Sequence, residues 1–233
     1  MSVLICKVSL LEAITDNIYR VHLIPESNFS FRAGQYLILQ ITEKNRRPFS
    51  IASTPMEKDI LELHIGASGY NAYTMSTIQH IKNNQRIIVD IPHGHAWLRE
   101  EKNYPLILIA GGTGFSYIRS ILLTALTQQK NRYITVYWGG REKKHLYELD
   151  DLNILASYHP NLNIYPILEN FTDGFSGRYG TVLSAVMEDY SCLSQHYIYL
   201  GGPISMVKSA RVLFCAERRA QLSLMFADAL NII

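Results

Sequence analysis

The clearest chemical signature in this chain is a glycine-rich turn, Gly111-Gly112-Thr113-Gly114-Phe115-Ser116. It follows a short apolar run and opens a stretch with helical periodicity. Glycine lets a backbone approach a bound group closely, and the first turn of a helix offers free N–H groups with partial positive charge. The turn is therefore suited to binding a pyrophosphate, although a strand-to-helix turn that binds nothing would look similar.

Neither of two common nucleotide-binding motifs is complete around this turn. No Gly-Lys-Ser/Thr follows it, which argues against a Walker loop and against ATP hydrolysis. It also departs from a strict G-x-G-x-x-G. The acidic residue expected about 20 residues later to bind a ribose is replaced by Trp138-Gly139-Gly140-Arg141. Arg141 could instead bind a ribose 2′-phosphate and so accommodate NADPH, or it is a solvated surface arginine.

A second glycine turn, Gly201-Gly202-Pro203, follows the last apolar strand and precedes Met206. Alone it is weak evidence, because Gly-Pro is common in loops. Both glycine turns end a buried strand of the same predicted sheet, so we expect them at one edge of that sheet. Their pairing favours a ligand site over two unrelated loops.

A serine motif, Arg47-Pro48-Phe49-Ser50, lies in the other half of the chain. A serine hydroxyl both donates and accepts hydrogen bonds. That property suits flavin N5, which changes from acceptor to donor when the ring is reduced. Taken alone, the motif favours a simpler interpretation, a strand edge with a buried Phe49.

The sequence contains no complete motif for a hydrolase or for a metal site. Gly174-Phe175-Ser176-Gly177 is not the G-x-S-x-G of a nucleophile elbow. His93-Gly94-His95 has no third ligand at a suitable spacing, so we interpret it as a polar loop and expect no metal. Cys6, Cys192 and Cys215 are far apart and odd in number, which argues against disulfide and iron–sulfur frameworks.

The elements that must position the glycine turns follow an alternating pattern. Leu106–Ala110 is a continuous apolar run, typical of a strand buried on both faces, and an apolar stripe beginning at Ile118 predicts the helix after it. Further strands are predicted at Ile134–Trp138, Leu162–Leu168 and Tyr197–Leu200, and further helices at Leu146–Leu155, Thr181–Met187 and Ser205–Arg218. This alternation predicts a Rossmann-like, doubly wound parallel sheet.

The first hundred residues read mostly as short strands, among them Gln35–Ile41, Ile60–Gly66 and Arg86–Pro92. One helix interrupts them, with Met75, Ile78 and Ile81 on one face and Asn71 as its cap. Several strands with a single helix predict a small β-barrel or sandwich. The charged stretch from Arg99 to Asn103 is the expected linker, which predicts domains at residues 1–101 and 102–233.

Composition narrows the class of protein further. The 233 residues are 48% hydrophobic and 18% charged, and 22 Lys and Arg against 20 Asp and Glu leave a net charge of +2. So small a charge argues against a nucleic-acid partner. No apolar run is long enough to cross a membrane, and the N-terminal residues lack the features of a signal peptide, so we expect a cytoplasmic protein without a membrane partner.

The motifs taken in order resemble the ferredoxin reductase superfamily over nearly the whole chain. The resemblance rests on Gly34-Gln35-Tyr36, the serine motif, Pro92-His93-Gly94 and the two glycine turns with Met206. The chain is most similar to bacterial NAD(P)H:flavin reductases of the Fre and LuxG type, through the segments RPFSIASTP, LELHIGAS, IPHGHAWLR, LILIAGGTGFSYIRSILLTAL and YWGGREKKHLY.

The resemblance implies an N-terminal antiparallel flavin-binding barrel and a C-terminal NAD(P)-binding domain. The implied reaction is hydride transfer from C4 of NADPH or NADH to N5 of a flavin. In this family FMN, FAD or riboflavin is usually an exchangeable substrate. The implied recipients of reduced flavin are ferric iron or other proteins, such as a flavin-dependent monooxygenase or a luciferase.

The resemblance also assigns residues to roles. Ser50 matches the catalytic serine that hydrogen-bonds flavin N5. The flavin site further includes Tyr36, Arg47, Pro48, Phe49, Ile65, Gly66 and Tyr73. The nucleotide site includes Gly111, Gly112, Thr113, Gly114, Phe115, Ser116 and Arg141, with Gly202, Pro203 and Met206 near the nicotinamide.

Two departures from the superfamily pattern leave alternatives open. Gly201 replaces the cysteine of a common Cys-Gly-Pro turn, and the last six residues contain no aromatic side chain to cover a flavin. One alternative is a reductase with bound FAD that passes electrons to a protein or a ferric chelate. Gly66-Ala67-Ser68-Gly69 is the candidate loop for its ADP moiety. A second alternative is a nucleotide-sensing module without activity, because one fold hosts many functions.

Overall fold

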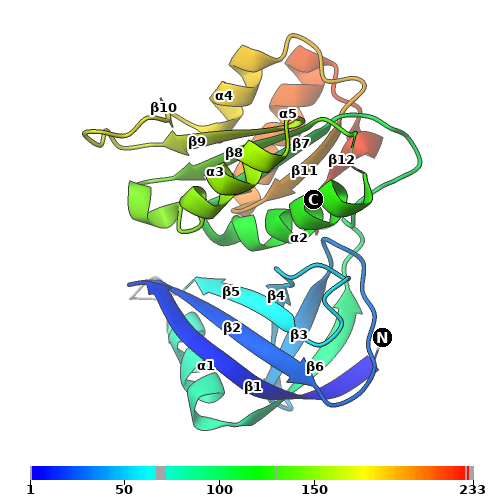
Figure 1. Cartoon of the computed structure of the whole chain (residues 1–233), viewed down its shortest axis with the longest axis vertical. Coiled ribbons are helices and arrows are strands. Elements are labelled where there is room, and N and C mark those ends of the chain that lie inside the picture. Colours follow the sequence, from blue (N-terminus) through cyan, green and yellow to red (C-terminus); the bar gives the residue numbers. More distant parts are fainter. Residues whose placement is uncertain (1, 67–71, 130, 229, 231–233) are drawn as a thin grey trace. The chain divides into compact units, whose positions relative to one another are not determined.

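The protein is described from a computed structural model that covers residues 2–66, 72–129, 131–228 and 230. Its contacts divide the chain into two compact units (Figure 1). The first unit comprises Met1–Leu98 and Arg119–Thr124, and the second comprises Arg99–Ile118 and Ala125–Ile233. Asn71 and most of the loop from Gly66 to Gly69 lie outside the described residues.

The first unit is built on a six-stranded antiparallel sheet with the order β4-β3-β6-β1-β2-β5. Its strands are β1 (Ser2–Thr15), β2 (Ile18–Pro25), β3 (Tyr36–Thr42), β4 (Asn45–Ser50), β5 (Leu61–Gly66) and β6 (Arg86–His93). The chain leaving β4 meets the edge strand β5, where the Ala52 N–H donates to the Glu62 carbonyl at 2.8 Å. The sheet therefore curls toward closure, which confirms the predicted barrel-like fold.

The core of the first unit is formed by alternate residues of these strands together with one helix, α1 (Ala72–Asn83). Leu37 and Leu39 of β3 are fully buried. Ile78 and Ile81 pack into the same core, as the helical spacing predicted, whereas Met75 is 42% exposed. The apolar stripe of α1 is thus one turn shorter than the spacing predicted.

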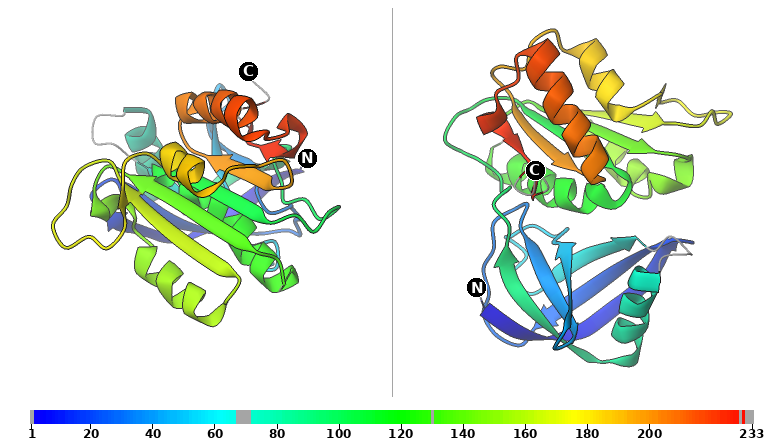
Figure 2. Two further views of the ribbon diagram at one scale, coloured as in Figure 1. Left: turned by 90° about the horizontal axis from the view of Figure 1, so that it is seen from above. Right: turned by 180° about the vertical axis from the view of Figure 1, so that it is seen from behind.

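The second unit is built on a parallel sheet with the order β10-β9-β8-β7-β11-β12. Its strands are β7 (Leu106–Gly111), β8 (Ile134–Gly140), β9 (Leu162–Leu168), β10 (Arg178–Tyr179), β11 (Tyr197–Gly201) and β12 (Met225–Phe226). Its helices are α2 (Phe115–Gln128), α3 (Leu149–Tyr158), α4 (Val182–Asp189) and α5 (Ile204–Arg218). Helices α2 and α3 cover one face of the sheet, and α4 and α5 cover the other (Figure 2).

This arrangement confirms the predicted doubly wound fold. The strand order reverses at β7, whose neighbours β8 and β11 lead to helices on opposite faces. Ligands of such sheets bind at the carboxyl ends of the strands where the order reverses. Helix α3 begins at Leu149 rather than Leu146, because a 3-10 turn at Lys143–His145 precedes it.

Among the residues that the structure describes, no helix is both long and apolar enough to cross a membrane.

Candidate functional site

The two glycine turns lie against each other at the carboxyl ends of β7 and β11. These strands are parallel neighbours, with Ala110 paired to Gly201. A Cβ added to Gly114 would lie 2.2 Å from the carbonyl carbon and oxygen of Gly201, and one added to Gly201 would lie 2.3 Å from the Gly114 oxygen. No side chain fits between the two backbones, so the spacing of these glycines is a packing requirement.

Met206 and Pro203 pack against the first glycine turn from the β11 side. A Cβ on Gly111 would lie 3.0 Å from Met206 Sδ and 3.3 Å from Pro203 Cδ. Gly202 has φ of +148°, which side chains rarely adopt, and the Met206 methyl group fills the space beside it. The structure thus brings the predicted nicotinamide-side residues against the first glycine turn, residues 111–116. We call this turn the nucleotide turn.

Trp138, which the sequence analysis assigned no role, holds the nucleotide turn in place. Its indole N–H donates to the Gly112 carbonyl at 3.1 Å, and its ring stacks on Phe115 with centroids 3.8 Å apart. The Ser116 hydroxyl donates to the Thr113 carbonyl at 3.0 Å. The side chains of Phe115 and Ser116 therefore shape the turn from inside. The signal for Trp138 was its place at the end of the strand beside β7.

Helix α2 begins directly after the first glycine turn. Gly114 precedes the helix and has no side chain to cap it, and the Phe115 N–H donates to the Gly112 and Thr113 carbonyls. Such a helix start attracts phosphate groups, and a Cβ on Gly112 would meet nothing within 4 Å, so the backbone there is open. These residues fit the pyrophosphate of a nicotinamide nucleotide. Arg141 is exposed just beyond β8, where the described residues offer its guanidinium no hydrogen bond.

On the first unit, Ser50 and Tyr36 stand side by side at the sheet edge. They are direct partners in the β3–β4 register, and β4 is an edge strand. Pro48 lies two residues before Ser50 on the same exposed face, as expected for a proline on an edge strand. The Ser50 hydroxyl is half-buried and forms no hydrogen bond within the described part of the chain. It is thus available to a ligand.

Other predicted flavin-site residues point away from Ser50. Arg47 is 5% exposed, donates to Thr77 Oγ1 at 2.5 Å, and lies with its guanidinium carbon 3.7 Å from the Tyr73 ring centre. This contact joins two predicted pocket residues and fastens α1 to β4. Phe49 packs against the core, and Ile65 is 1% exposed within it. Only the backbone of Ile65 remains for a ligand, as at the half-buried Gly66.

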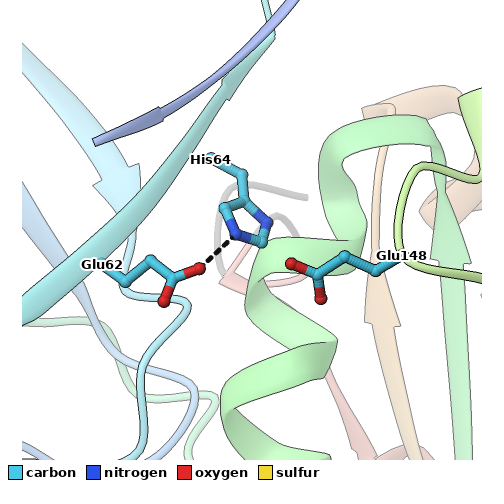
Figure 3. A group of neighbouring side chains, drawn as sticks. All are labelled: Glu62, His64 and Glu148. Carbon is cyan, nitrogen blue, oxygen red and sulfur yellow. Dashed lines mark hydrogen bonds and ion pairs between the residues drawn. The ribbon is translucent and has the colours of Figure 1, made fainter. Parts of the chain in front are cut away.

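The sequence did not predict a buried charged cluster that is centred on Glu62 of β5. Figure 3 shows Glu62 and His64, whose Oε1 and Nε2 atoms are 2.7 Å apart. Arg20 Nε and Arg119 lie 3.4 Å and 3.6 Å from the Glu62 carboxylate. Burial acts to raise the pKa of Glu62, but the His64 hydrogen bond and the charges of Arg119 and Arg20 outweigh it. They lower the pKa to about 2.

Glu62 is therefore expected to stabilise the fold in a pH-dependent way. The folded pKa of about 2 lies below the reference value of 4.5, so the stabilisation is present above pH 4.5 and lost as the pH falls toward 2. Glu62→Gln is expected to lower the free energy of unfolding at pH 7 by about 3 kcal/mol. The deficit should shrink as urea unfolding is repeated at lower pH. Exposed Glu57→Gln is the control, and equal curves for Glu62→Gln and wild type at pH 7 would contradict the assignment.

Comparisons with known proteins agree with this geometry. The oxidoreductase NAD-binding domain family matches residues 108–212. An NAD(P)H-flavin reductase of Vibrio harveyi is 42% identical over 229 residues, covering 96% of this chain and 97% of that protein. An NAD(P)H-flavin reductase of Aliivibrio fischeri is 41% identical over 233 residues, with 98% of both chains covered.

A solved structure of a related reductase has a similar fold. The Amycolatopsis cytochrome P450 reductase GcoB superimposes with a TM-score of 0.88 at 27% identity, and the match covers 97% of this chain and 69% of that one. The family predicted from the order of the motifs is thereby confirmed. On its full-length identity to these relatives, the chain belongs to the family of NAD(P)H-flavin reductases.

Proposed function

We propose that this chain is an NAD(P)H:flavin oxidoreductase that reduces free FMN, FAD or riboflavin. The observation that carries the proposal is the full-length identity to NAD(P)H-flavin reductases, 42% over 96% of the chain. The contact between the two glycine turns supports a nucleotide site in the second unit. The available Ser50 hydroxyl beside Tyr36 supports a flavin site in the first.

In the proposed reaction the protein mainly binds and orients the two substrates. When bound, the two substrates supply a hydride donor at nicotinamide C4 and an acceptor at flavin N5. The start of α2 and the backbone of Gly111 and Gly112 would hold the pyrophosphate. Ser50 offers its hydroxyl to N5 and switches between donating and accepting. No general base is required from the chain for the hydride itself.

The reduced flavin is proposed to leave the protein and to serve other acceptors. A flavin-dependent monooxygenase, a luciferase or ferric iron are the acceptors that fit a chain of this family. A cytoplasmic location is supported by Cys6, Cys192 and Cys215, which are all free thiols, as expected in a reducing compartment.

The visible spectrum and an NADPH oxidation assay test the proposal together. We expect a colourless purified protein that oxidises NADPH or NADH only when riboflavin or FMN is added. A yellow protein that turns over with a ferric chelate and ignores added flavin would point to bound FAD instead. Nucleotide binding without turnover would leave a sensing module, and either of these results would overturn the proposal.

Arg141 is the proposed contact for the 2′-phosphate of NADPH. Arg141→Ala is expected to raise the KM for NADPH about tenfold while leaving the KM for NADH within about twofold, because a charge-assisted contact contributes on the order of 1.5 kcal/mol. Steady-state rates with both nucleotides at saturating riboflavin measure the difference. Lys143→Ala, a change two residues away, is the control. Equal effects of Arg141→Ala on both nucleotides would show that Arg141 does not contact the phosphate.

A further inference from the structure

Three side chains stand in a row across β4, β3 and β6 of the first unit. Tyr36 pairs with Ser50 in the β3–β4 register and with His93 in the β3–β6 register. Directly opposed residues of antiparallel strands point to the same face. That face is turned away from the core, since the neighbouring Leu37 is fully buried on the other side. Tyr36 thus links the proposed catalytic hydroxyl to a histidine that the proposed function does not use.

His93 packs directly against the Tyr36 ring. The two ring centres are 5.6 Å apart and their planes differ by 22°, which is a stacked arrangement. This spacing lies within the range in which aromatic pairs attract each other. The His93 side chain is 13% exposed, so the contact is largely shielded from water. The imidazole is therefore one of the contacts that hold the Tyr36 ring.

An irregularity in β6 directs His93 toward a charged pair. Tyr36 and Ile38 are two residues apart on β3, but their partners His93 and Asp90 are three residues apart on β6. The extra residue is a bulge, which brings Asp90 and His93 to one face. There His93 Nε2 lies 3.2 Å from Asp90 Oδ2, a close contact without hydrogen-bond geometry.

Asp90 is itself fixed by an ion pair with Arg46. Its Oδ2 atom accepts a hydrogen bond of 2.7 Å from Arg46, which precedes the serine motif on β4. Arg46, Asp90 and His93 thus form a continuous series of contacts that ends on the Tyr36 ring. The series begins and ends within a few residues of Ser50. Bulges that aim a side chain in this way are common next to active sites.

We propose that His93 is a positioning residue of the flavin site. It holds the Tyr36 ring so that the flat isoalloxazine ring of a flavin lies beside Ser50, and Asp90, held by Arg46, fixes the imidazole. The inference rests on the proposed function, because it needs Tyr36 and Ser50 to contact flavin. It adds a role for the Pro92-His93-Gly94 segment, which resembled the family without an assigned task.

Riboflavin is the probe that tests this role, because it carries the ring without a phosphate. His93→Ala is expected to weaken riboflavin binding and to raise its KM by about fivefold, the size of one aromatic pair. The KM for NADPH and kcat should stay within about twofold of wild type. His93→Phe, which keeps a flat ring, should recover most of the affinity. His159→Ala, which removes a histidine of the second unit, is the matched control.

The outcomes separate the inference from the proposed function. Quenching of riboflavin fluorescence on binding gives the affinity without any turnover. A wild-type protein that neither binds nor reduces riboflavin would defeat the proposed function itself. An active wild type with unchanged riboflavin affinity in His93→Ala, or with equal losses in His93→Ala and His93→Phe, would overturn only the positioning role.

A milder change keeps the test informative if His93→Ala does not fold. Asp90→Asn preserves the shape of the side chain and removes the charge that faces His93 and Arg46. It is expected to weaken riboflavin binding about twofold to threefold, since one ion-pair contact is lost while the ring stack remains. Unchanged riboflavin affinity in Asp90→Asn, with an intact thermal transition, would remove Asp90 from the series and the proposed support of His93 with it.

Discussion

Replacing Ser50 with alanine is expected to lower kcat/KM for riboflavin by about 100-fold, the usual effect of removing one positioned hydrogen-bonding group at a reacting atom. The hydroxyl is half-buried on an edge strand and makes no hydrogen bond with the described residues, so its loss breaks no hydrogen bond of the fold. Steady-state NADPH oxidation at varied riboflavin measures the loss. The thermal transition should stay at its wild-type temperature.

Ser50→Thr is the matched control, because it keeps a hydroxyl at the same backbone position. We expect it to retain activity within about tenfold of wild type, the difference reflecting the restricted rotation of a β-branched side chain. Full activity of Ser50→Ala with riboflavin, FMN and FAD alike would mean that the serine has no catalytic role. The flavin site would then have to be sought elsewhere in the first unit.

The second large effect is expected at Gly114. In Gly114→Ala the added methyl group would lie 2.2 Å from the Gly201 carbonyl and 2.4 Å from the Gly202 nitrogen. Both are backbone atoms, so the two turns must move apart. We expect the free energy of unfolding to fall by about 3 kcal/mol. NADPH-dependent turnover should fall by about 100-fold, because a displacement near 1 Å at a binding site has effects of that size.

Gly174→Ala separates this clash from backbone strain. Gly174 has φ of +69°, but a Cβ there would meet nothing within 4 Å. The substitution should cost only the left-handed strain, about 1 kcal/mol, and should leave the KM for NADPH unchanged. Urea unfolding and steady-state kinetics of the wild type, Gly114→Ala and Gly174→Ala compare the stability and the NADPH kinetics of the three proteins. Wild-type kinetics in Gly114→Ala would contradict the tight contact between the turns.

The parallel half of the chain was the easier to predict. Strands buried on both faces are continuous apolar runs, so the predicted range Leu106–Ala110 agrees with β7 to within one residue. The antiparallel half carries a weaker signal, because its strands alternate between core and solvent. β1 and β2 were not delimited from sequence, and their pairing contains two register shifts that disturb the alternation. The barrel class could still be inferred from the number of short strands.

The candidate site residues also differ in how well the sequence predicts them. The glycine turns are visible in sequence because a close approach of two backbones requires glycine wherever it occurs. Trp138, Glu62 and His93 gain their roles from partners on other strands or helices, such as Gly112, Arg119 and Tyr36. No local pattern marks such pairings, and the β6 bulge that aims His93 exists only in the assembled sheet.

The contact between Trp138 and the nucleotide turn also means that tryptophan fluorescence reports on that turn. The chain has only two tryptophans, and the other, Trp97, belongs to the first unit. Trp138 is fully buried, with its indole N–H bound to the turn and its ring stacked on Phe115. In a Trp97→Phe protein, all of the tryptophan emission would come from this one indole. The chain therefore carries a built-in fluorophore at its nucleotide turn, and no dye has to be attached there.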